Sequence, residues 1–290
     1  MTEPAERYVD LPAGPFRVLD WPGREPAVVM LHGLSGVAEV WGPTVTAMGP
    51  AHRRCIAIDQ RGHGHSPKPE SGYGVASYAG DALALFRALG LTRPHVAGHS
   101  MGARVAMVLA ARHPRAIRSV AIVDIGPEAW KANWQQTVAA LDRLPESYPD
   151  AETAIGGAAR PSAPSSIDAA PGRPAAEVLR NIALARLRTR GDGSVEWLAS
   201  RDSLKRTVMN HRSRNYWRDW SRLAIPAMFV RGGQSAEVRP RIAAEMRRRN
   251  PGVVYAELAG IGHNVPLLAP GALAVALEAF WETVERDHRG

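Results

Sequence analysis

Short apolar, β-branched runs alternate with helical patterns along most of this chain, and this alternation constrains the fold more than any other feature. It is typical of a mostly parallel sheet with helices on both faces. We predict strands at 16–21, 27–33, 55–60, 95–100, 119–124, 227–232 and 253–260. Apolar residues at helical spacing predict helices over 77–90, 101–114 and 271–287. We therefore expect an α/β protein with a doubly wound sheet.

The alternation stops after residue 125 and resumes only with the run "IPAMFVRGG". The interruption holds arginine-rich helical patterns, several tryptophans and a Pro- and Ala-rich part from Gly156 to Ala176. We interpret it as a helical subdomain, 126–222, inserted into a core domain formed by 1–125 and 223–290. The Pro- and Ala-rich part is predicted as a mobile loop or a poorly ordered connector.

The composition limits the class of protein and of partner. With 45% hydrophobic residues in 290, the chain can bury a large core, and its single cysteine rules out an internal disulfide. We see no signal-peptide pattern and no apolar window long enough for a bilayer, so we expect a cytoplasmic protein without a membrane partner. The net charge of +8 comes from arginines spread along the chain, without a nucleic-acid-binding motif, so we expect no nucleic-acid partner. The oligomeric state stays open.

The pentapeptide "GHSMG", 98–102, lies directly between a predicted strand and a predicted helix. In this context G-x-S-x-G predicts a sharp turn that lifts the serine hydroxyl above the sheet. The turn has unfavourable backbone angles, so Gly98 and Gly102 must both lack bulk. The helix N-terminus beside Ser100 favours developing negative charge. We therefore predict Ser100 as a nucleophile.

Two further motifs predict partners for this serine. "LHGLSG", 31–36, ends a strand, and its turn leaves the amide of Leu34 free to form an oxyanion hole with the amide of Met101. We expect the ring of His32 only to order this loop. In "GIGHNVP", His263 follows the last strand. Because a general base must titrate near neutrality, we predict His263 as the base that takes the serine proton.

Taken together, the "HG" turn, "DQRGHGHS" (59–66), the "GHSMG" elbow and the late "GIGHNVP" resemble the α/β-hydrolase superfamily. The resemblance covers nearly the whole chain apart from the insertion. It implies the α/β-hydrolase fold and a Ser–His–acid triad that acts through an acyl-enzyme, with the insertion as a helical cap over the site. It also implies structural roles for Asp59, Arg61 and Gly62.

The acid of the triad has two candidate positions. In much of the superfamily an aspartate follows the strand that we place at 227–232, but here Ala236 stands at the expected position and Glu237 comes one residue later. The other known location follows the preceding strand, where Asp124 ends "SVAIVD". Both loops lie at the carboxyl ends of strands, where open α/β sheets build their sites. We predict Asp124 as the acid, with Glu237 as the alternative.

A serine nucleophile argues against the dehalogenase and epoxide hydrolase branches, which attack through a carboxylate. We predict hydrolysis of a carboxylic ester, lactone or thioester of a moderately sized apolar acid, with no metal or organic cofactor. A cofactor-free haloperoxidase or acyltransferase, a carbon–carbon hydrolase and a ligand receptor on the same scaffold are the alternatives. Trp41, Trp130 and Val265 are predicted to contact this small-molecule substrate. We expect the arginines of the insertion at the solvated surface, with attraction of an anionic substrate as the alternative.

Overall fold

A single eight-stranded sheet organises the protein, whose computed structural model describes residues 3–128, 134–156, 176–212 and 214–287. The strand order is β1-β2-β4-β3-β5-β6-β9-β10. The bounds are β1 (Ala5–Leu11), β2 (Gly14–Trp21), β3 (Arg24–Leu31), β4 (Arg53–Ile58), β5 (His95–His99), β6 (Ser119–Val123), β9 (Ala227–Gly232) and β10 (Val254–Leu258). β2 pairs antiparallel with β1 and β4, and all other neighbours pair in parallel. The predicted α/β class and mostly parallel sheet are confirmed.

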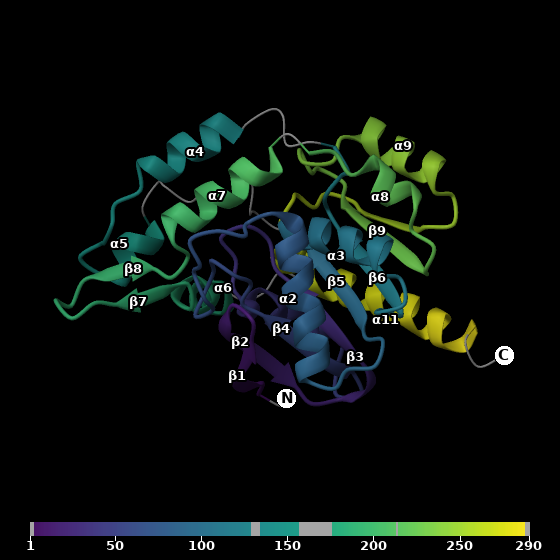
Figure 1. Cartoon of the computed structure of the whole chain (residues 1–290), viewed down its shortest axis with the longest axis horizontal. Coiled ribbons are helices and arrows are strands. Elements are labelled where there is room, and N and C mark those ends of the chain that lie inside the picture. The colour runs from purple at the N-terminus through teal and green to yellow at the C-terminus, as the bar shows by residue number, and fades with distance from the viewer. Residues whose placement is uncertain (1–2, 129–133, 157–175, 213, 288–290) are drawn as a thin grey trace.

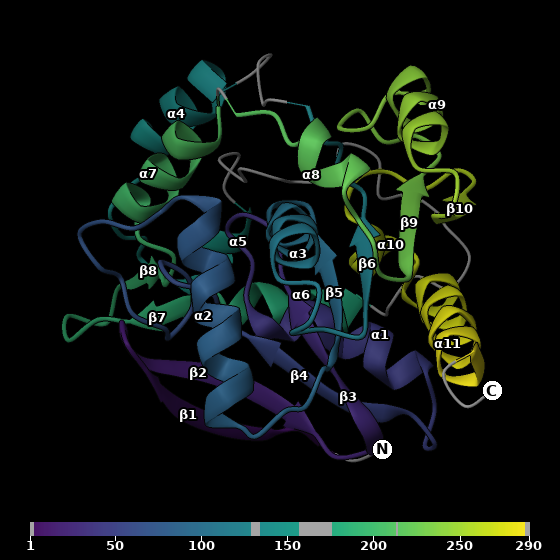
Figure 2. The same ribbon diagram turned by 45° about the vertical axis from the view of Figure 1, so that its right-hand side comes forward.

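Helices cover both faces of this sheet (Figures 1 and 2). One face carries α2 (Val75–Ala88), α3 (Met101–Arg112), α8 (Trp217–Ser221) and α9 (Pro240–Arg249). The other carries the 3-10 helix η1 (Ala38–Trp41), α1 (Gly42–Ala47), α10 (Val265–Leu268) and α11 (Pro270–Asp287). Because helices cover both faces of β5 and β6, every residue of these two strands is buried. Strands in such a position need apolar side chains at nearly every position.

All seven predicted strands and all three predicted helices are present, with ends shifted by a few residues. The sequence pattern missed β1, in which only Val9 and Leu11 are buried. An edge strand that faces water on most positions lacks the apolar run by which the other strands were found.

Between β6 and β9, the described residues form α4 (Trp134–Asp142), α5 (Ala151–Gly156), α6 (Ala176–Leu184), α7 (Arg201–His211) and α8. A two-stranded hairpin, β7 (Leu187–Thr189) with β8 (Val195–Trp197), was not predicted, because three-residue strands rich in polar residues give no period. Most of the predicted Pro- and Ala-rich connector, residues 157–175, lies outside the described residues.

Helix α7 is fixed to the core domain by two hydroxyl pairs. Tyr73 Oη lies 2.7 Å from Ser203 Oγ, and Tyr78 Oη lies 2.7 Å from Thr207 Oγ1. Figure 2 shows α4 and α7 on the side toward which β5 and β6 point.

The division into a core domain and a cap of 126–222 stays a prediction. Across the described part of the chain, no helix combines the length and the hydropathy that a membrane span requires.

Candidate active site

Ser100 stands on a sharp turn between β5 and α3. Its backbone angles, φ 53° and ψ −117°, lie in a region that side-chain-bearing residues rarely adopt. A Cβ atom on Gly98 would lie closer than 3.0 Å to backbone atoms of Gly102, and one on Gly102 would lie equally close to the Leu31 carbonyl. Both glycines are therefore required sterically, as predicted, and the strained turn exposes part of Ser100.

His263 connects Ser100 to Asp124 through both ring nitrogens. It lies in the loop between β10 and α10, with its side chain 26% exposed. Its Nδ1 is 2.7 Å from Asp124 Oδ2, and its Nε2 is 2.9 Å from Ser100 Oγ. Because a carboxylate only accepts, Nδ1 carries the proton and Nε2 accepts from the serine hydroxyl. This arrangement suits His263 to take a proton from Ser100.

Asp124 occupies the end of β6 and is fully buried, with a positive φ of 52°. Besides the histidine, its carboxylate accepts from the amide of Gly232 at 2.8 Å and from the hydroxyl of Ser235. The carboxylate thus has three hydrogen-bond donors, and none of the described arginines or lysines forms an ion pair with it. Asp124 therefore holds the His263 ring in one orientation.

Glu237, the alternative acid, is not brought to His263. It is exposed, and its backbone amide donates to Ser235 Oγ at 3.2 Å. The loop after β9 thus supplies donors to Asp124 in place of a carboxylate. Ser235 was not predicted from the sequence. The available signal was its position, one residue before the place where an aspartate was expected.

The predicted oxyanion amides lie on either side of Ser100. A Cβ atom on Gly33 would lie 3.1 Å from Ser100 Cβ, so the loop after β3 passes directly over the serine. Gly36 donates to the Gly33 carbonyl at 3.0 Å and closes a turn around Leu34. Within the residues that the structure describes, the amides of Leu34 and Met101 donate no hydrogen bond. Both are available to a substrate oxygen.

Two buried histidines position the loops around the serine. His32 donates from Nδ1 to the Gly33 carbonyl at 2.7 Å and accepts at Nε2 from the amide of Gln60 at 3.0 Å. Burial lowers its pKa to about 4, so the ring stays neutral and orders the loop. His99, which the sequence analysis missed, donates from Nε2 to the His263 carbonyl at 2.8 Å. Burial, with His263 beside it, lowers the pKa of His99 to about 3.

The "DQRGHGHS" segment has the structural role that the resemblance implied. Asp59 is fully buried and accepts from the amides of Ala38 at 2.8 Å and His65 at 3.0 Å. Arg61 pairs with Asp81 on α2 through two hydrogen bonds of 2.5 Å. These contacts fix the loop after β4 to η1 and α2.

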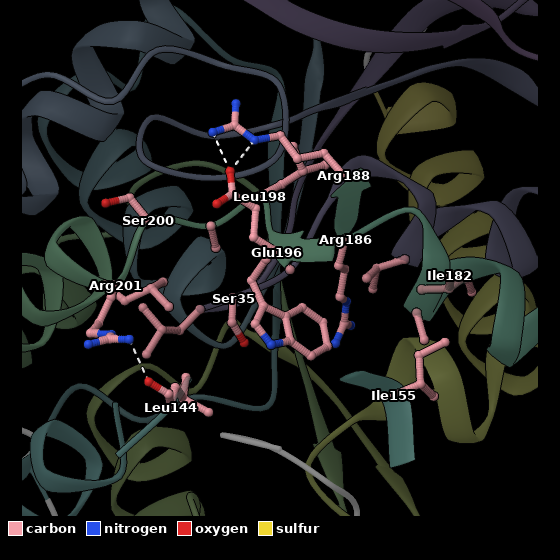
Figure 3. Close-up of a pocket in the computed structure, with 18 of the residues that line it drawn as sticks. Ser35, Leu144, Ile155, Ile182, Arg186, Arg188, Glu196, Leu198, Ser200 and Arg201 are labelled. Carbon is pink, nitrogen blue, oxygen red and sulfur yellow. Dashed lines mark hydrogen bonds and ion pairs between the residues drawn. The ribbon is translucent and has the colours of Figure 1, made fainter. Parts of the chain in front are cut away.

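A cavity of about 760 Å³ is lined by residues of the insertion and of the loops that neighbour Ser100, while Ser100 and His263 themselves are not among the described residues that line it. Its inner end is formed by His99, Asn264 and the turn from Gly33 to Gly36, which neighbour Ser100 and His263. Its apolar walls come largely from the insertion, and Figure 3 shows Leu144, Ile155, Ile182 and Leu198 around it. The cavity therefore begins at the loops that hold Ser100 and His263.

The residues predicted to contact the substrate are placed elsewhere. Trp41 and Val265 are fully buried in the core on the α11 side, and neither lines the cavity. This corrects the prediction, because η1 and α10 turn both side chains toward the sheet. Trp130 lies outside the described residues. In the described ranges, no three His, Cys, Asp or Glu side chains are grouped as metal ligands would be.

Comparisons with known proteins identify the family to which this chain belongs. The family model for the alpha/beta hydrolase fold matches residues 26–270. A 2-(acetamidomethylene)succinate hydrolase of Mesorhizobium japonicum is 30% identical over 264 residues, which cover 89% of this chain and 88% of that protein. An esterase of Mycobacterium tuberculosis is 29% identical over 281 residues, covering 93% and 88%. The crystal structure of E-2-(acetamidomethylene)succinate hydrolase, at 26% identity, gives a TM-score of 0.82 and covers 96% of this chain and 99% of that one.

The family model spans most of the chain, and the eight-stranded sheet has the architecture of its structural relatives. The chain belongs to the α/β hydrolase fold family.

Proposed function

We propose that this protein is a serine hydrolase that cleaves a carboxylic ester, lactone or thioester through an acyl-enzyme intermediate. The observation that carries the proposal is the hydrogen-bonded series from Ser100 through His263 to Asp124. Nucleophile, base and orienting acid each stand within hydrogen-bond distance of the next, which is the geometry that nucleophilic catalysis by serine requires.

In the proposed reaction, Ser100 Oγ attacks the acyl carbonyl while His263 Nε2 takes its proton. Asp124 stabilises the imidazolium that forms, and the amides of Leu34 and Met101 bind the oxyanion. His263 then gives the proton to the leaving alcohol or thiol. In the second half, His263 activates a water molecule that attacks the acyl-enzyme, and Ser100 is restored. The insertion, as a cap, forms the walls of the acyl site.

The test is active-site labelling combined with turnover. A fluorophosphonate probe is expected to modify the unmodified protein at Ser100, and a series of 4-nitrophenyl esters is expected to give steady turnover. Ser100→Ala should lose both, whereas the matched change Ser221→Ala, at an exposed serine on α8, should keep both. Absence of labelling and turnover in the unmodified protein would overturn the proposal.

One observation favours amide hydrolysis as a second candidate. The relative at 30% identity is named as the hydrolase of a compound with an acetamido group. Turnover of 4-nitroacetanilide against 4-nitrophenyl acetate separates the two. An amide hydrolase is expected to cleave the anilide at a rate that Ser100→Ala abolishes, while an ester hydrolase should cleave only the ester.

A further inference from the structure

Arg104, in the first turn of α3, is a buried cation that the proposed reaction does not use. Only 4% of its surface is exposed, and within the described ranges no carboxylate lies within ion-pair distance of its guanidinium. Burial lowers its pKa, so the charge is held at a cost. Since well-packed apolar side chains often replace buried charges without loss of stability, packing alone does not account for an arginine here. Its role therefore follows from what the guanidinium contacts.

The guanidinium binds the segment that follows Asp124. Its Nη2 donates to the carbonyl of Glu128 at 3.1 Å and to the carbonyl of Gly126 at 3.4 Å. Gly126 comes only two residues after Asp124. Asp124 itself has a positive φ of 52°, a conformation that costs energy and persists where the surrounding structure enforces it. The hydrogen bonds from Arg104 therefore hold the chain directly beyond this strained residue.

The main chain of Arg104 is connected to the turn of the nucleophile. Its amide donates to the carbonyl of Ser100 at 3.1 Å. The amide of Ser100 in turn donates at 3.0 Å to the carbonyl of Val123, the residue before Asp124. Arg104 thus joins the turn that carries the nucleophile to the loop that carries the acid, with its backbone at one and its side chain at the other.

The two chain segments that lead into and out of the insertion also meet at Arg104. Tyr216, directly before α8, donates its amide to the carbonyl of Pro127 at 2.6 Å. The Arg104 Cζ atom lies 5.5 Å from the centre of the Tyr216 ring, a cation–π contact between two buried side chains. Arg104 therefore holds the segment after Asp124 from one side while Tyr216 holds it from the other.

We propose that Arg104 is a positioning residue for hydrolysis, which fixes the segment after β6 so that the Asp124 carboxylate stays aligned with His263 Nδ1. This inference rests on the proposed hydrolase function and adds a residue to it. Arg104 touches neither the substrate nor the reacting atoms, so it acts only through Asp124. Without its donors the carbonyls of Gly126 and Glu128 lose their hydrogen bonds, the segment relaxes, and Asp124 no longer selects the tautomer of His263 that can take a proton from Ser100.

Arg104→Met tests this role, because methionine keeps much of the volume of the side chain but has no donor. For a 4-nitrophenyl ester, we expect kcat to fall about ten- to a hundredfold, with KM changed less than about twofold. Arg104→Lys should recover part of the loss, since a lysine can still donate to a carbonyl. Thermal unfolding verifies the fold of each variant.

Arg112→Met is the matched control on the same helix. Arg112 pairs with Asp219 on α8 through two hydrogen bonds, of 2.7 and 3.0 Å. The control therefore also removes a contact between α3 and the insertion, but none with the segment that follows Asp124. We expect its kcat to stay within about twofold of that of the unmodified protein. Equal losses in Arg104→Met and Arg112→Met, or an unchanged kcat in Arg104→Met, would overturn the proposal.

Coupling to the acid separates positioning from a general loss of structure. In an Asp124→Asn background, Arg104→Met should lower kcat no further, because the residue through which Arg104 acts has already been removed. Losses that multiply in the double variant would refute the role. If Arg104→Met does not fold, Arg104→Lys undergoes the same comparison, with a partial loss expected alone and no further loss beside Asp124→Asn.

The tautomer of His263 gives a readout that does not depend on turnover. NMR of protein with isotope-labelled histidine nitrogens reports which ring nitrogen carries the proton. We expect Nδ1 in the unmodified protein and in Arg112→Met, Nε2 in Asp124→Asn, and a mixture of the two in Arg104→Met. The same tautomer in Arg104→Met as in the unmodified protein would overturn the proposal. Failure of the hydrolase proposal looks different, because no ester would then be cleaved while the tautomers would still test Arg104.

Discussion

Replacement of Asp124 by asparagine tests the arrangement around Ser100 most directly. The carboxylate serves three donors, and its Oδ2 atom serves two of them, His263 Nδ1 and the Ser235 hydroxyl. In the variant, the amide oxygen can still accept from Gly232. Its NH2 group then faces His263, and because this group only donates, the ring must accept at Nδ1. The proton moves to Nε2, which can no longer take one from Ser100.

The size of the effect follows from this change of tautomer. The ring remains in place, so substrate binding and the oxyanion amides are kept while the base is lost. In Ser–His–Asp hydrolases the same replacement lowers kcat by about 10⁴-fold, or about 5.5 kcal/mol in the activation barrier. We expect a loss of this order in kcat for Asp124→Asn, with KM changed little.

The assay measures kcat and KM for a 4-nitrophenyl ester, with thermal unfolding to verify the fold. Glu237→Gln is the matched control, since it makes the same chemical change at an exposed position. We expect it to stay within about twofold of the unmodified protein. If Asp124→Asn kept turnover within a few-fold, the reasoning would be refuted. A large loss confined to Glu237→Gln would transfer the acid's role to that residue.

Three further outcomes follow from contacts of single residues. Gly98→Ala should lower the free energy of unfolding in urea by about 3 kcal/mol through backbone overlap. Gly80→Ala, with open space on α2, should raise it by up to about 1 kcal/mol, and equal effects would refute the steric account. Ser235→Ala should lower kcat about tenfold by removing a donor from Asp124, with recovery in Ser235→Thr; an unchanged kcat would contradict this. Burial lowers the pKa of His95 to about 3 from 6.5, so between these values the unfolded chain binds a proton that the folded chain excludes. The free energy of unfolding should therefore fall as the pH falls through this range, by up to about 1.4 kcal/mol per pH unit from His95. Urea titrations at neutral pH and near pH 5 measure this change. In His95→Gln the free energy of unfolding should depend less steeply on pH.

The sequence predicted the elements whose burial is complete. Strands such as β5 and β6 have both faces covered, so every position is buried, most positions are apolar, and the run can be recognised without reference to a neighbouring strand. β1 lies at an edge of the sheet, and the β7–β8 hairpin lies in the insertion. The residues of these elements therefore do not form the apolar run that marks a fully buried strand. Each of these strands pairs with a strand that is adjacent in sequence, but too few of their positions are apolar for the pattern to mark them as strands.

The site was predicted in the same uneven way. The sequence pointed to Ser100 and His263, which the structure brings within hydrogen-bond distance, because strand-to-helix turns restrict which residues can surround them. The choice between Asp124 and Glu237 needed three-dimensional distances, since both follow strands on the same edge of the sheet. Trp41 was misplaced because an aromatic residue near a loop can face either a cavity or a core, and the sequence does not record its direction.

The contact between Asp124 and Ser235 bears on which strand can supply the carboxylate beside His263. The ends of β6 and β9 converge on one point beside His263 Nδ1, so a carboxylate arriving from either strand would meet the same nitrogen. The arrangement calls for a carboxylate at one place in space, and either strand end could carry it without a change in the position of the histidine.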